Sequence, residues 1–155
     1  MSLIRDAVSL SEILPVTRRL LMEDLIEGQE FTVAVVDHDG GTVALPVIEI
    51  RSKNAFFDFE SKYDPNLCDE LCPAPIDDEL AERLKDVALE AHKMIGARHL
   101  SRTDIIVDQS GVIWFLEINT IPGLTNASLA PKAITAAGLQ LENLLESWIR
   151  DVVSP

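Results

Sequence analysis

Short apolar segments predict strands in the first third of the chain. Residues 18–25 are mostly apolar, residues 31–36 are apolar and β-branched, and residues 42–50 continue in the same way. Short runs of this kind, separated by turn residues, are typical of β-strands. Glu27-Gly28 and residues 37–41, which read Asp-His-Asp-Gly-Gly, supply the turns. The pattern therefore predicts an antiparallel meander of three strands.

A three- and four-residue spacing of apolar positions begins after residue 77. Asp77 is suited to cap a helix, and the apolar stripe that follows it ends at Gly96. Residues 100–108 and 112–120 return to strand-like patterns on either side of the turn Gln109-Ser110-Gly111. These segments predict a long helix followed by a β-hairpin.

The remaining segments complete an α+β order of elements. Residues 3–14 resemble the end of a helix before Pro15, and two helices are expected near 129–137 and 140–152. Residues 55–76 mix aromatic residues, acids and prolines without a period, so they predict a long loop, and such loops are often functional. Strands, loop, helix, strands and helices in this order indicate an α+β fold rather than alternating βαβ units.

Composition and charge narrow the functional classes. The 155 residues fit one domain, and 47% of them are hydrophobic. The net charge of -13 argues against a nucleic-acid partner and an anionic membrane surface, because both bind clustered Lys and Arg. No run approaches the roughly 20 apolar residues that span a bilayer, and the N-terminus lacks a signal-peptide pattern. Cys68 and Cys72 are interpreted as loop thiols in a reducing compartment, so we expect a cytoplasmic protein.

The predicted hairpin carries the clearest candidate chemistry. Side chains alternate faces along a strand, and a two-residue turn sets Asp104 opposite Phe115. Asp104, Glu117 and Asn119 then converge on one face, with Arg102 beside them. Two carboxylates and an amide oxygen are hard ligands that suit magnesium. A salt bridge from Arg102 to Glu117 satisfies the same residues, so spacing alone leaves both interpretations open.

Other candidate residues are isolated. Lys62 could hold a phosphate or be a solvated surface lysine, and Glu23 and Glu30 could be ordinary acids of an exposed hairpin. The sequence contains neither a glycine-rich Walker loop nor a GxGxxG dinucleotide fingerprint. From spacing alone, these residues assign no function.

Taken together, the ordered motifs resemble the C-terminal part of the D-alanine–D-alanine ligase family. The resemblance covers nearly the whole chain after about residue 20, and its most specific parts are the Glu-x-Asn-Thr-x-Pro-Gly segment from Glu117 to Gly123 and the Lys62-Tyr63 pair. The matching segments are residues 21–33, 44–50, 56–63, 72–74, 101–104, 116–125 and 128–129.

The resemblance implies an ATP-grasp fold. Residues 1–155 would form a single C-terminal ATP-grasp domain, the large lobe, as an antiparallel sheet with flanking helices. Residues 1–20 would be a partial lead-in helix. The N-terminal domain and the small ATP-grasp lobe of the family have no counterpart in this sequence.

The resemblance also assigns roles to single residues. Arg102, Tyr63 and Ser128 would be catalytic: Arg102 would face the transferred phosphate, Tyr63 would belong to the closing loop, and Ser128 would lie near the carboxylate of the second substrate. The other implied roles are adenine contacts for Glu23, Asp24, Leu25 and Ile26, a ribose contact for Glu30, a phosphate contact for Lys62, magnesium (or manganese) ligands for Asp104, Glu117 and Asn119, and the second-substrate region for Gly123, Ser128 and Leu129.

The implied activity is the ATP- and magnesium-dependent ligation of two D-alanines for peptidoglycan synthesis. It would need the missing N-terminal part, so the isolated chain is expected to be inactive, and the resemblance allows a homodimer of the full-length enzyme. Asp24 stands where many relatives carry a basic residue, and Asn126-Ala127 replaces a common Ser-His pair. The alternatives are therefore a ligase that uses D-lactate or D-serine as second substrate, or an inactive nucleotide- or metal-binding module.

Overall fold

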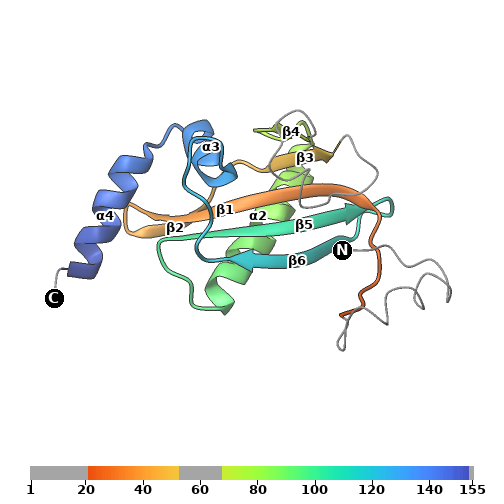
Figure 1. Cartoon of the computed structure of the whole chain (residues 1–155), viewed down its shortest axis with the longest axis horizontal. Coiled ribbons are helices and arrows are strands. Elements are labelled where there is room, and N and C mark those ends of the chain that lie inside the picture. Colours follow the sequence, from red (N-terminus) through yellow and green to blue (C-terminus); the bar gives the residue numbers. More distant parts are fainter. Residues whose placement is uncertain (1–20, 53–67, 154–155) are drawn as a thin grey trace, which may run out of the picture.

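Strand β1 (Gly28–His38) is the spine of the fold because it pairs with three other strands, all antiparallel to it. The structure is a computed structural model that describes residues 21–52 and 68–153. Its six-stranded sheet has the order β4-β3-β1-β5-β6, and β2 pairs with the end of β1 (Figure 1). The other elements are β2 (Gly41–Ala44), β3 (Ile48–Ser52), β4 (Cys68–Leu71), α2 (Asp78–Met94), β5 (Leu100–Asp108), β6 (Ile113–Asn119), α3 (Leu129–Ala136) and α4 (Leu141–Val153).

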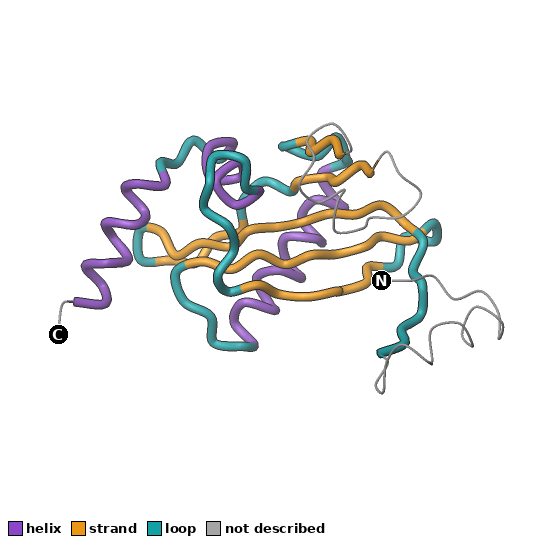
Figure 2. The backbone as a smooth tube through the Cα atoms, viewed as in Figure 1, coloured by secondary structure: helices purple, strands orange, loops and turns teal. Residues whose placement is uncertain are grey.

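Alternation along β1 gives the sheet its two covered faces. Phe31, Val33 and Val35 belong to the core under α2, whereas Ala34 and Val36 belong to the core under α3 and α4. Successive side chains of a strand point to opposite faces, so one strand can contribute to both cores. Figure 2, viewed as Figure 1, shows the long helix α2 running obliquely across the strands and the short helix α3 in the upper part of the view. The α+β prediction, an antiparallel sheet with flanking helices, is confirmed.

Helix α2 begins and ends where the sequence predicts. The Asp77 carboxylate accepts a hydrogen bond from the Leu80 backbone N–H at 2.8 Å, which satisfies one of the unpaired donors of the first turn. Leu84 and Ala88 are fully buried against the sheet. Gly96 follows the helix with a φ of 64°, in the left-handed region that glycine adopts without strain.

The hairpin β5–β6 is confirmed, but its predicted register is wrong. Asp104 pairs with Glu117 rather than Phe115, and Phe115 pairs with Ile105. A β-bulge next to Asp104 inserts one residue, Leu116, into β6 between these pairs. Such an extra residue shifts every later pair by one position. The pairs on the turn side of the bulge are also offset from the prediction by one position, because Val107 pairs with Ile113. The two offsets together place two carboxylates directly opposite each other.

Other boundaries differ from the prediction. Within the predicted strand 18–25, residues 21–25 have no regular structure and the rest lies outside the described residues. Of the expected turn Glu27-Gly28, Glu27 has no regular structure and Gly28 begins β1. The predicted strand 42–50 is divided into β2 and β3, because residues 45–47 have no regular structure. The predicted loop 55–76 contains β4, so Cys68 is a strand residue, not a loop thiol.

Predictions for residues 3–14 and for the start of that loop lie outside the described residues. The two C-terminal helices are confirmed as α3 and α4. In the part of the chain that the structure describes, no helix is long and apolar enough to cross a membrane.

A buried polar network joins α2, α4 and the ends of β1 and β5. The Trp148 indole N–H donates to the Asp37 backbone carbonyl at 2.9 Å, and the Asp37 carboxylate accepts the His99 backbone N–H at 2.5 Å. His92, 2% exposed, makes a 2.7 Å hydrogen bond with Ser101. Burial lowers the pKa of His92 below 6.5, against the opposing charge of Asp37. At pH values just below 6.5, His92 therefore stays neutral in the folded protein, whereas the same histidine in the unfolded chain begins to bind a proton.

We expect acidification below about pH 6.5 to destabilise the fold through His92. Because the pKa of His92 is lower in the folded protein, the unfolded chain binds more protons just below pH 6.5. The contribution of His92 to stability is therefore complete above this pH and decreases as the pH falls. Melting temperatures of the parent and of His92→Gln, measured between pH 7.5 and 5.5, should show a smaller acid-induced decrease for the variant. The same substitution at the partly exposed His38 is the control. Parallel curves for parent and His92→Gln would contradict this assignment.

Candidate active site on the open sheet face

Two neighbouring cross-strand pairs bring four of the predicted site residues together. Asp104 lies opposite Glu117, and Arg102 lies opposite Asn119. Directly opposed residues of an antiparallel pair share a face. Thr32, which pairs with Asp104 from the other side, belongs to the same face. This carboxylate face is the one that α3 covers farther along β1, because Ala34 lies two residues from Thr32 and packs under α3.

The Asp104 carboxylate is the centre of this group. Its Oδ1 accepts the Thr32 hydroxyl at 2.6 Å and Arg102 Nε–H at 2.9 Å, and its Oδ2 accepts an Arg102 terminal N–H at 2.8 Å. Burial alone would lower the pKa of Arg102, but its hydrogen bonds to Asp104 and the charges of Asp104 and Glu117 raise it above the ordinary value. The guanidinium is therefore a permanent cation held in one orientation.

The salt bridge considered between Arg102 and Glu117 does not describe this site. The ion pair runs within one strand, from Arg102 to Asp104, and their side chains are only 11% and 19% exposed. Glu117 is exposed and faces Arg102 only as a neighbouring charge. Glu117 therefore forms no ion pair with Arg102 across the two strands.

The oxygen atoms on this face suit a hard divalent cation. A carboxylate offers about four lone-pair positions and an amide oxygen two. The described hydrogen bonds occupy three positions on Asp104 and one on Asn119 Oδ1, which accepts the Ile121 N–H at 2.9 Å. Glu117 is open to solvent. Each of the three residues therefore retains oxygen positions for magnesium, which prefers carboxylate and carbonyl ligands.

Glu30 is the fifth predicted residue on the carboxylate face. It is two positions before Thr32 in β1 and pairs with Ile106 of β5 and Ile50 of β3. The structure thus places the predicted ribose ligand one row away from the predicted metal ligands. Lys62 and Tyr63 lie outside the described residues.

The predicted adenine segment leads directly into β1. Glu23, Asp24 and Leu25 are exposed, and Ile26 is half-buried, in a stretch without regular structure. Leu21 and Met22, just before it, are 85% and 72% exposed. The structure therefore brings this segment to the end of β1 that bears Glu30, and an adenine contact there stays a prediction.

The predicted second-substrate residues meet where the β6–α3 loop enters the helix. Ser128 is at the N-cap of α3 but makes no capping hydrogen bond; its hydroxyl contacts the Thr125 hydroxyl at 2.9 Å and accepts the Thr125 N–H at 3.2 Å. A Cβ on Gly123 would lie 2.7 Å from Ser128 Oγ, so a larger residue there would displace the Ser128 hydroxyl from its present position. Leu129 is the first residue of α3. The N–H groups of the first turn are therefore not capped by Ser128.

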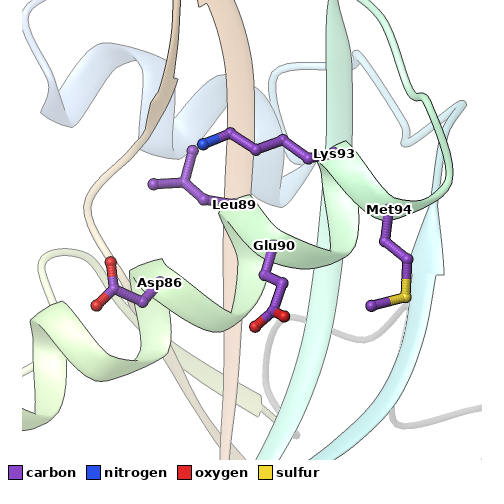
Figure 3. Close-up of a pocket in the computed structure, with 5 residues that line it drawn as sticks. All are labelled: Asp86, Leu89, Glu90, Lys93 and Met94. Atoms are coloured by element: carbon purple, nitrogen blue, oxygen red, sulfur yellow. The ribbon is translucent and has the colours of Figure 1, made fainter.

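A shallow hollow along α2 is not a candidate site. Asp86, Leu89, Glu90, Lys93 and Met94 line it, and Figure 3 shows that all five side chains come from one helix. Since α2 packs on the opposite side of the sheet from α3, this hollow is separated from the carboxylate face. Within residues 21–52 and 68–153, no group of three or more His, Cys, Asp or Glu side chains could hold a metal. The mixed set of Asp104, Glu117 and Asn119 remains the metal candidate.

Comparison with known proteins identifies the family to which the chain belongs. The family model described as "D-ala D-ala ligase C-terminus" matches residues 4–150. The chain belongs to the D-alanine–D-alanine ligase family. Among curated members, the D-alanine--D-alanine ligase of Desulforudis audaxviator is 45% identical over 132 residues, which cover 85% of this chain and 42% of that protein. The Desulfotalea psychrophila ligase is 43% identical over 132 residues, covering 84% and 41%.

Solved structures of the family share the fold. The Bacillus anthracis D-alanine--D-alanine ligase complexed with ATP has a TM-score of 0.72 and 32% identity, covering 94% of this chain and 47% of that one. VanG D-Ala:D-Ser ligase from Enterococcus faecalis has a TM-score of 0.66 and 34% identity, covering 81% and 36%. The predicted ATP-grasp fold is thereby confirmed. The chain spans less than half the length of the family members it matches.

Sequence reasoning missed Thr32, the hydroxyl that supports the central carboxylate. The sequence contained part of the information, because Thr32 and Glu30 are two positions apart in one strand and therefore share a face. Recognising it required the β1–β5 pairing, which joins residues 72 positions apart. The metal, nucleotide and substrate roles of the residues in this D-alanine–D-alanine ligase domain remain proposals.

Proposed function

We propose that this chain is the C-terminal, metal- and substrate-binding part of a ligase that joins two D-alanines at the expense of ATP. The observation that carries the proposal is the arrangement of Asp104 opposite Glu117 and Arg102 opposite Asn119, in a chain of this family. Residues 1–155 would form one C-terminal ATP-grasp domain, with residues 1–20 leading into it. An N-terminal part would complete the active site.

Asp104, Glu117 and Asn119 would hold magnesium, or manganese, at the phosphates of ATP. The ion would offset charge on the phosphates during transfer to the carboxylate of the first D-alanine. The contribution of Arg102 follows from its geometry. Two of its five N–H donors hold Asp104, which leaves three for a phosphate oxygen. Because Asp104 fixes the plane of the guanidinium, little reorganisation is needed when charge develops.

The start of α3 would receive the carboxylate of the second D-alanine. Uncapped N–H groups and the helix dipole favour an anion at a helix N-terminus. Ser128 adds a hydroxyl there, and Gly123 leaves room for it. Leu129 begins the turn whose N–H groups would face the carboxylate. With its carboxylate held here, the amine of the second D-alanine would attack the acyl phosphate, and phosphate would leave.

The nucleotide would lie across the start of β1. The segment Glu23, Asp24, Leu25 and Ile26 would meet adenine, and Glu30 would bind the ribose hydroxyls. Lys62 would bind phosphate, and Tyr63 would belong to the loop that closes over the reactants. We place the enzyme in the cytoplasm, where it would supply the dipeptide for peptidoglycan synthesis, and a homodimer of the full-length form is consistent with the family.

A ligase that uses D-serine second is the other candidate. The similarity to VanG D-Ala:D-Ser ligase supports it. Specificity of this kind depends on a few contacts in the second-substrate region rather than on the fold. The sheet face with Arg102 and Asp104 would serve either ligase.

The test is an assay of a ligase that carries this chain as its C-terminal part. Phosphate release and product formation would be measured with ATP, magnesium and D-alanine, alone and with D-serine or D-lactate. D-Alanyl-D-alanine as the main product supports the proposal, and a preference for D-serine supports the second candidate. ATP or metal binding without phosphate release under any condition would instead identify an inactive binding module.

Ser128→Ala is expected to impair use of the second amino acid more than use of ATP. A hydrogen bond to a charged carboxylate contributes on the order of 1.5–3 kcal/mol, so its KM should rise about 10- to 100-fold. Thr135→Val is the matched control, because it removes a hydroxyl from the other end of α3. An unchanged KM for the second amino acid, with a raised KM for ATP, would move Ser128 out of this subsite.

A further inference from the structure

An ion pair ties the start of α3 to the far edge of the sheet. The Lys132 ammonium donates to the Glu70 carboxylate of β4, across 62 residues of sequence. Their side chains are 37% and 26% exposed, so water screens this pair less than a fully exposed one. Neither residue was a predicted site residue. The pair nevertheless involves the helix whose N-terminus carries Ser128.

The sheet register places Glu70 on the carboxylate face. Glu70 pairs with Ile50, and Ile50 pairs with Glu30. Opposed residues share a face, so Glu70 and Glu30 occupy the same side of the sheet as Asp104. Burial, together with the charges of both Glu70 and Glu30, raises the pKa of the nearby Cys68 thiol, whereas the charge of Lys132 opposes that shift. Lys132 is therefore a cation at the edge of the face that holds the proposed ribose and metal ligands.

On α3, Lys132 lies one helical turn after Ser128. The Lys132 backbone N–H donates to the Ser128 carbonyl at 3.3 Å, which links the two residues across the first turn. Hydrogen bonds between Thr125 and Ser128 tie the helix start to the preceding loop, but these contacts are local and do not reach the sheet. The buried residues of this short helix, Ala130, Ala133 and Ile134, pack its inner side in the core. The ion pair of Lys132 adds a directional contact between this helix and the edge strand.

We propose that the Lys132–Glu70 ion pair positions the α3 N-terminus, and with it the second-substrate subsite at Ser128, relative to the metal-binding carboxylates. This inference rests on the proposed ligase function. Lys132 and Glu70 touch neither substrate in this scheme and act through Ser128 and the first turn of α3. Loss of the ion pair allows the N-terminus of α3 to shift. A displacement of about 1 Å is enough to weaken the action of a preorganised site.

The test is a set of variants in a ligase that carries this chain. Lys132→Met and Glu70→Gln each remove one charge with little change in shape, and the double variant Lys132→Glu/Glu70→Lys restores the pair with reversed signs. Each single variant should raise the KM for the second amino acid about tenfold, within the range of coupling measured for contacting residues. The KM for ATP should change less than about twofold by the same scale. The double variant should recover most of the loss.

Lys85→Met on α2 is the matched control. Lys85 also makes an ion pair, with Glu82 at 2.8 Å, but on the helix that covers the opposite face of the sheet. It should leave both KM values unchanged. Melting temperatures of all variants separate a change in position from a loss of folding.

The outcomes separate this inference from the proposed function. A parent ligase without turnover removes the proposed function and this inference with it. An active parent whose single variants keep a normal KM for the second amino acid overturns the inference alone. So does an equal rise in both KM values, or a double variant no better than the singles, because each indicates a structural role only.

Discussion

Glu117→Gln in a ligase that carries this chain should lower turnover by about two to three orders of magnitude, since metal-ion stabilisation of the transition state is worth several kcal/mol. The substitution keeps the shape of the side chain but removes an anionic oxygen directly opposite Asp104. The fold should be unaffected, because Glu117 is exposed and surface substitutions usually change stability by less than about 0.5 kcal/mol. Turnover measured over a range of magnesium concentrations, together with a melting curve, tests both statements.

The control is Glu146→Gln on α4, an exposed glutamate whose ion-pair partner, Arg150, lies on the same helix. It should retain the parent's turnover. If Glu117→Gln kept near-normal turnover at ordinary magnesium, Glu117 would not be a metal ligand. If it lost its cooperative melt, Glu117 would instead support the hairpin. Partial recovery of Glu117→Gln at high magnesium would strengthen the metal assignment.

The 155-residue chain by itself should fold cooperatively and show no ligase turnover. Folding is expected because β1 contributes to a core on each face of the sheet, under α2 and under α3 with α4. Inactivity is expected because the chain covers only 41–42% of two curated relatives. Holding both reactants in attack geometry contributes about 7–11 kcal/mol of barrier reduction, and that contribution needs a complete site.

The measurement combines a melting curve with a phosphate-release assay in ATP, magnesium and D-alanine. Adding the N-terminal part of the Desulfotalea psychrophila ligase as a separate polypeptide should restore activity to a chain that is folded but incomplete. A chain carrying Glu117→Gln should not be restored by the same addition. Turnover of the isolated chain on the order of 1 s⁻¹ or more, as in an ordinary enzyme, would show that these residues form an active site unaided.

Local patterns were enough to predict much of this fold. The apolar stripe of α2 and the cap at Asp77 are encoded within a few residues, and the same is true of the hairpin turn after Asp108. A strand's alternation likewise determines which residues share a face, so Arg102 and Asp104 were grouped correctly before any pairing was known. Recognition of the family depended on short motifs of the same local kind.

The sequence by itself therefore determined the α+β class, α2, the hairpin and the four hairpin residues of the carboxylate face, Arg102, Asp104, Glu117 and Asn119. Only the tertiary structure decided how that face is assembled. The bulge beside Asp104 sets Glu117 opposite it, and the β1–β5 pairing brings in the Thr32 hydroxyl. The Lys132–Glu70 pair joins α3 to an edge strand that local pattern had assigned to a loop. The physical reason is that register, bulges and ion pairs between distant segments depend on which elements pack together, and alternation or helical periodicity within one segment does not contain that information.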